Sequence, residues 1–127
     1  MSYAQVYGQW QKDPEGFWMD AAKGIDWIAA PTRALNDSRA PLYEWFTDAR
    51  VNTCWNAVDR HVQAGRGKQP AIIHDSPVTG TKHVITYAEL LDRVSRLAGA
   101  LKAKGVEKGD RVIIYMPMVP EALEAML

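Results

Sequence analysis

The sequence predicts an α/β protein with a helical, tryptophan-rich N-terminal part, followed by the beginning of a larger domain that contains a β-hairpin, a helix, a parallel strand and a partial helix. Three observations support this class. All five tryptophans precede residue 66. Two β-rich runs, 71–75 and 83–87, flank a segment of turn residues. The run RVIIYM (111–116) is apolar on both faces, which is typical of a parallel strand covered on each side.

The N-terminal half predicts short helices joined by turns that contain proline. Ser2 and Gln5 have the spacing of a capping box, in which each side chain bonds the backbone of the other. Asp13 suits the N-cap of a second helix, because Pro14 at the first helical position has its φ angle fixed at a helical value. We therefore expect two helices within the first 25 residues.

A third helix is predicted from about 52 to 64. Trp55, Val58 and Val62 fall on one face of it, at the spacing of a half-buried helix. Gly65 then suits the left-handed conformation that closes many helices, since glycine has no Cβ.

The second half predicts a longer helix directly after the hairpin. Thr86 and Glu89 have capping-box spacing, and Gly105 ends the run. Apolar residues recur between them at the 3.6-residue period, namely Leu90, Leu91, Val94, Leu97, Ala98 and Leu101. This stripe is expected to face a sheet.

The last predicted elements are the strand 111–116 and a helix that starts at Pro120. A parallel strand requires a returning crossover, and the helix after Pro120 has only two turns before residue 127. We therefore expect the chain to continue into further β/α units beyond residue 127.

Composition excludes several classes of function. The 127 residues carry 15 basic and 15 acidic side chains, so no net charge attracts nucleic acid or an anionic membrane surface. No apolar run approaches the roughly 20 residues that span a bilayer, and the first residues lack the features of a secretory signal. The single cysteine, Cys54, cannot form an intramolecular disulfide. We expect a cytoplasmic protein that binds neither nucleic acid nor membrane.

Several residues have a structural and a functional interpretation. Asp59 and His61 could form an acid–base pair, but positions i and i+2 of a helix do not face each other, so we favour a surface or local hydrogen-bonding role. The three histidines, His61, His74 and His83, lie on separate elements without the spacing of metal ligands. Cys54 at a helix start could be a nucleophile, although a buried thiol is the commoner state.

Two short segments resemble loops that bind phosphate. VTGTK (78–82) contains glycine, threonine and lysine, but it has a single glycine and joins two antiparallel strands, so we favour a hairpin turn. GRGK (65–68) follows a helix rather than a strand. The tryptophans could stack on nucleic acid bases, yet without a basic stripe we interpret them as core or interface anchors.

The chain resembles a known family. NTCWNAVDRHV (52–62), ITYAELLDRVSRLAGAL (85–101) and GVEKGDRVIIYMPMVPEALEAML (105–127) are similar to the N-terminal part of the AMP-forming short-chain acyl-CoA synthetases, in the adenylate-forming superfamily. Two further stretches, APLYEWFTDARVNTC (40–54) and DSPVTGTK (75–82), resemble the propionyl-CoA branch more than the acetyl-CoA branch. The resemblance implies that residues 1–65 are a helical N-terminal extension and that 66–127 begin the large AMP-binding domain.

A complete member of this family joins a small carboxylate, propionate or acetate, to the α-phosphate of ATP with the help of magnesium, and then transfers the acyl group to coenzyme A. The family's phosphate loop, adenine contacts, hinge and catalytic lysine match no position up to 127. The resemblance therefore implies no catalytic, cofactor-binding or metal-binding residue in this stretch. It implies a ligase fragment that is inactive alone, binds no cofactor specifically, and packs on the rest of the synthetase or self-associates. The alternative is a naturally short, non-enzymatic interaction module derived from such an enzyme.

Overall fold

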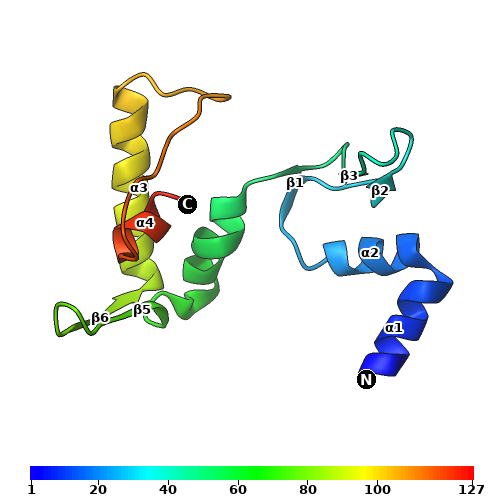
Figure 1. The fold of residues 1–127 in the computed structure, drawn as a ribbon, viewed down its shortest axis with the longest axis horizontal. Coiled ribbons are helices and arrows are strands. Elements are labelled where there is room, and N and C mark those ends of the chain that lie inside the picture. Colours follow the sequence, from blue (N-terminus) through cyan, green and yellow to red (C-terminus); the bar gives the residue numbers. More distant parts are fainter. The chain divides into compact units, whose positions relative to one another are not determined.

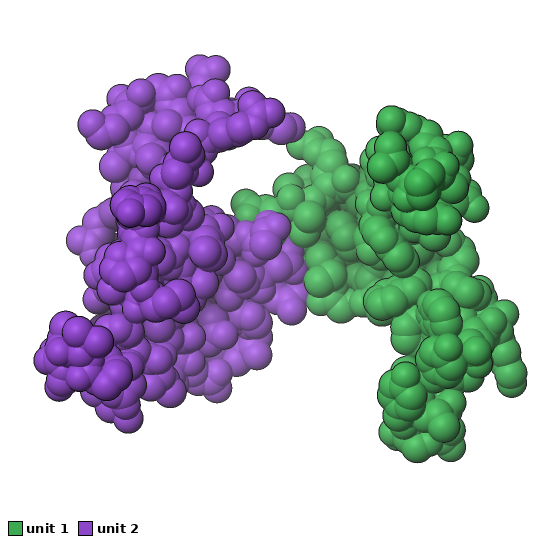
Figure 2. Space-filling view, in the orientation of Figure 1, with its two compact units in different colours: residues 1–52 green, residues 53–127 purple.

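A computed structural model describes residues 1–127 (Figure 1), which form two compact units, Met1–Asn52 and Thr53–Leu127 (Figure 2). The first unit contains two helices and four very short strands. The second contains a helix with wide turns, a β-hairpin, a long helix and a short final helix. The mixture of helices and strands confirms the α/β class.

Helices α1 (Tyr3–Lys12) and α2 (Pro14–Ala22) begin where the sequence predicts. The Gln5 amide donates to Ser2 Oγ over 3.4 Å, and the Ser2 amide donates to Gln5 Oε1 over 2.7 Å, which completes the capping box. Asp13 Oδ1 accepts a hydrogen bond of 2.9 Å from the Gly16 amide at the start of α2. Both caps satisfy amides that the first turn of a helix leaves unpaired.

The rest of the first unit contains strands that the sequence did not predict. They are β1 (Trp27–Ala29), β2 (Leu35–Asn36), β3 (Glu44–Trp45) and β4 (Arg50–Val51). β1 pairs with β4 and β2 with β3, both antiparallel. Ladders of two or three residues are too short to show the alternating apolar pattern that identifies a strand. Glu15 connects α2 to this region, because its Oε1 accepts a 2.5 Å hydrogen bond from the Ala34 amide.

The second unit begins with the predicted helix, whose turns are wider than expected. Residues 53–66 are helical, and two segments, η1 (Trp55–Asp59) and η2 (Val62–Arg66), have the i→i+5 bonding of a π-helix. Gly65 has a φ of +78°, as its predicted closing position requires. Val58 is fully buried.

The hairpin and the long helix are confirmed. β5 (Pro70–Ser76) and β6 (Thr81–Thr86) are antiparallel, and α3 (Tyr87–Ala103) follows at once. The Thr86 amide donates to Glu89 Oε2 over 2.8 Å, and the Glu89 amide donates to Thr86 Oγ1 over 3.3 Å. The core of this unit joins three elements through Val58 of η1, Ile85 of β6, and Leu90 and Val94 of α3.

The predicted parallel strand at 111–116 is wrong for this structure, since these residues form no regular element. Ile113 and Tyr115 are 90% and 99% exposed. A strand forms only beside another strand that accepts its hydrogen bonds. Here β5 and β6 pair only with each other, so 111–116 has no partner.

The final helix, α4 (Pro120–Glu124), starts at the predicted proline and contacts α3 (Figure 1). Its Glu124 carboxylate accepts a 3.0 Å hydrogen bond from Arg93 of α3. None of the helices has both the length and the apolarity that crossing a bilayer would require.

Candidate functional site

The loop that most resembles a phosphate-binding loop is a hairpin turn. Residues 77–80 join β5 to β6, and Gly80 has a φ of +64°. The Lys82 ammonium lies 3.0 Å from the Asp75 carboxylate, its neighbour across the hairpin. The predicted hairpin is therefore confirmed. GRGK also lies where the sequence predicts, at the end of the π-helical segment.

Cys54 has the environment of an unreactive thiol. It is half-buried and unpaired, and its Sγ lies 3.9 Å from Asp59 Oδ2. Burial raises the pKa of the Cys54 thiol, and the negative charge of Asp59 raises it further. Because the thiolate is the nucleophile, a raised pKa disfavours nucleophilic chemistry at Cys54.

Asp59 and His61 interact with different groups. The Asp59 carboxylate accepts a hydrogen bond from the Cys54 thiol. The His61 ring packs against Tyr87 with ring centroids 5.0 Å apart, and its Nδ1 bonds the Arg66 guanidinium. These local contacts agree with the structural interpretation of the two side chains.

His74 and His83 lie together although they are nine positions apart in the sequence. They are direct partners in the β5–β6 register, and their rings are parallel within 4° with centroids 6.4 Å apart. Nδ1 of His74 is buried and has no hydrogen-bond partner. From the sequence, these histidines were assigned to separate elements. Their proximity could have been predicted only from the register of the hairpin.

An open cavity of about 480 Å³ adjoins this histidine pair. Its wall includes Thr79, Thr81, Arg93 and Glu121, so it joins the hairpin to α3 and the start of α4. The positive charge of Arg93 is offset by the carboxylate of Glu124, whose side chain is only 11% exposed. Nowhere do three or more histidine, cysteine, aspartate or glutamate side chains gather closely enough to hold a metal ion by themselves.

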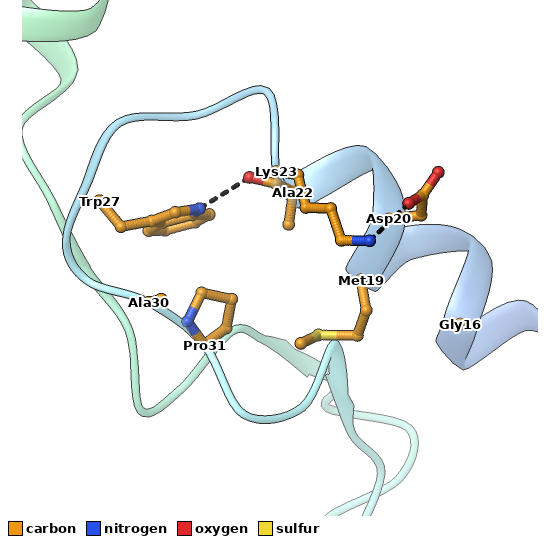
Figure 3. Close-up of a pocket in the computed structure, with 8 residues that line it drawn as sticks. All are labelled: Gly16, Met19, Asp20, Ala22, Lys23, Trp27, Ala30 and Pro31. Atoms are coloured by element: carbon orange, nitrogen blue, oxygen red, sulfur yellow. Dashed lines mark hydrogen bonds and ion pairs between the residues drawn. The ribbon is translucent and has the colours of Figure 1, made fainter.

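The first unit has a separate pocket of about 390 Å³ (Figure 3). The Trp27 indole and the Pro31 ring lie at one end, and the ion pair between Asp20 and Lys23 lies at the other. The indole N–H donates to the Ala22 carbonyl oxygen over 2.8 Å, which fixes the ring. The Lys23 ammonium, by hydrogen bonding and then by charge, lowers the pKa of Asp20. The carboxylate that lines this pocket, Asp20, is paired with Lys23, and the rest of the wall is mostly apolar.

Tryptophans also line an apolar cavity of about 530 Å³ in the first unit, beside α2. Trp18 and Trp45 meet edge to face with ring centroids 5.4 Å apart, and Trp10 lines the same cavity. Such contacts hold short elements together where a continuous core is missing. This arrangement agrees with the interpretation of the tryptophans as anchors.

Two family models match the chain in succession. Residues 3–57 match the acetyl-coenzyme A synthetase N-terminus, and residues 58–127 match the AMP-binding enzyme family. The junction falls within the π-helical segment, at the buried Val58.

Individual relatives agree with these matches. The chain is 52% identical over 115 residues to acyl-CoA synthetase short-chain family member 3, mitochondrial, of Bos taurus, which covers 91% of this chain and 17% of the relative. It is 48% identical over 124 residues to acetyl-coenzyme A synthetase of Streptomyces avermitilis, which covers 98% of this chain and 19% of the relative. The chain therefore spans about a fifth of the length of the curated relatives it matches. With both family models matched in order, the chain belongs to the AMP-binding enzymes of the adenylate-forming superfamily, and it corresponds to the N-terminal part of their short-chain acyl-CoA synthetases.

Proposed function

We propose that the whole protein is an AMP-forming short-chain acyl-CoA ligase, which converts propionate, ATP and coenzyme A into propionyl-CoA, AMP and pyrophosphate through an acyl-adenylate. The observation that carries this proposal is the order of the two family matches, over 3–57 and 58–127. An acetyl-CoA synthetase N-terminus followed directly by an AMP-binding domain supports a short-chain acyl-CoA ligase.

The chemistry explains why the reaction uses ATP and magnesium. A carboxylate is a poor electrophile, and joining it to the α-phosphate makes AMP a good leaving group. A metal ion and fixed positive charges neutralise the phosphates as they separate. Coenzyme A then attacks the activated acyl group.

Within this proposal, residues 1–65 are the N-terminal extension and 66–127 begin the AMP-binding domain, and neither part supplies a catalytic, cofactor-binding or metal-binding residue to the ligase reaction. The side chains that resemble catalytic groups have structural partners, such as Asp75 for Lys82 and Asp59 for Cys54. Residues 1–127 alone should therefore release no pyrophosphate from ATP and propionate. Carboxylate-dependent release above a buffer control would contradict this assignment.

We infer that propionate is preferred over acetate, since the stretches 40–54 and 75–82 resemble the propionyl-CoA branch. One additional methylene in an apolar pocket contributes roughly 1 to 3 kcal/mol, which predicts a 10- to 200-fold preference in kcat/KM and measurable activity with acetate. Steady-state kinetics of the whole protein with both acids test the inference. An equal or higher kcat/KM with acetate would assign the protein to the acetyl-CoA branch.

A further inference from the structure

The β5–β6 hairpin holds two imidazoles in a geometry suited to chelation. His74 and His83 are directly opposite in the register, and direct partners on neighbouring strands project from the same face of the hairpin. Their rings are parallel, with centroids 6.4 Å apart. Two nitrogens bound to one tetrahedral zinc lie about 3.3 Å apart, because each Zn–N bond is about 2.0–2.1 Å. The χ2 torsion of histidine is broad, so both rings can tilt toward a shared ion.

The His74 ring also has an unsatisfied atom. Its Nδ1 is buried without a hydrogen-bond partner, and a buried polar atom in this state destabilises the fold. Coordination would give this nitrogen the partner that the protein does not provide. His83 is exposed, so its ring can reorient and solvent can reach it.

Charge at the adjoining cavity favours a cation over an anion. Arg93 is the only basic side chain other than the histidines in the cavity wall, and its charge is offset by Glu124 at 3.0 Å. The Glu121 carboxylate remains in the wall as a further negative charge. Lys82 adds no positive charge to the cavity wall, because its ammonium pairs with Asp75 at the neighbouring position of the register.

From this geometry we propose that His74 and His83 form a two-histidine site for a divalent transition-metal ion such as Zn²⁺, Cu²⁺ or Ni²⁺. Imidazole nitrogen suits these ions, whereas Mg²⁺ prefers oxygen ligands. Water completes the coordination, and the Glu121 carboxylate is placed in the same cavity to hold one of these waters. This site is independent of the ligase reaction, since it uses no ATP and no acyl substrate.

Calorimetric titration of the full chain with ZnCl₂, without nucleotide, tests the site. Wild type should bind Zn²⁺ with one-to-one stoichiometry attributable to the pair. His74→Ala and His83→Ala should each weaken this binding by about 100-fold, the lower end of the gain from linking two ligands. His61→Ala is the matched control, since it removes the third histidine of residues 1–127, and it should leave the affinity unchanged.

Because His83 is exposed, His83→Ala should not disturb folding. Circular dichroism checks that each variant is folded. A titration with MgCl₂ should show no binding that depends on the pair. The proposal is overturned if either single variant at the pair retains wild-type affinity, or if His61→Ala loses as much affinity as they do. It is also overturned if the wild-type chain binds no Zn²⁺.

Discussion

Val58 provides the most direct test of the core that joins the π-helical segment to the hairpin and α3. Its side chain is 0% exposed and packs with Ile85, Leu90 and Val94. Val58→Ala removes two methyl groups from the centre of this cluster without adding a polar atom. The substitution therefore tests packing alone.

The expected cost follows from burial and from the space left behind. Each buried methylene-sized group contributes about 0.8 kcal/mol, which gives roughly 1.6 kcal/mol for two. A cavity that does not collapse adds about 24 cal/mol per Å³, so the total is about 1.5 to 3 kcal/mol. Backbone amides of α3 that exchange through opening of this core should exchange about 10- to 150-fold faster, because each 1.4 kcal/mol is a factor of ten.

Hydrogen exchange measured by mass spectrometry on α3 peptides reads out this change. Val78→Ala is the matched control, because Val78 lies in the hairpin loop and is 92% exposed. It should shift exchange by no more than the roughly 0.5 kcal/mol that is usual for surface positions. Equal exchange in the Val58→Ala chain and the wild type would refute the packing described for this core.

Three other predictions concern single groups or surfaces. The Thr86 amide and then its hydroxyl lower the pKa of Glu89, so the stability from this contact is present above the unfolded-state pKa and is lost as the pH falls through the folded-state pKa. The start of α3 should therefore fray, as seen by NMR, when the pH falls below the ordinary glutamate pKa of about 4.3, and Thr86→Ala should weaken that dependence. Iodoacetamide should alkylate Cys54 more slowly than a free cysteine near neutral pH, and Asp59→Asn should speed the reaction; rapid labelling of the wild type would contradict the raised thiol pKa. Residues 1–127 alone should bind a hydrophobic dye or self-associate, since Ile113, Tyr115 and Met118 are 90%, 99% and 94% exposed; a monodisperse monomer without dye binding would oppose this expectation.

Local signals in the sequence predicted the elements whose ends are fixed by side chains. The capping boxes at Ser2 and Thr86 and the proline at position 120 mark helix starts in the structure as in the sequence. The hairpin was also predictable, because β-rich runs on either side of turn residues specify it locally.

Features that depend on distant partners were not predictable in the same way. The run 111–116 has the composition of a central strand, yet no strand of this chain is available to pair with it. The strand pairs β1–β4 and β2–β3 contain too few residues to show the alternating apolar pattern of a strand. The juxtaposition of His74 and His83 depends on the hairpin register, which the residue types alone left open.

The products of the reaction test the central claim most directly. The whole protein, incubated with ATP, Mg²⁺, coenzyme A and propionate, should form AMP, pyrophosphate and propionyl-CoA in equal amounts, because activation passes through an acyl-adenylate. Chromatographic separation of the nucleotides measures this directly, with a reaction lacking propionate as the control. Formation of ADP and phosphate, or AMP formation that does not depend on a short-chain carboxylate, would contradict the proposed function.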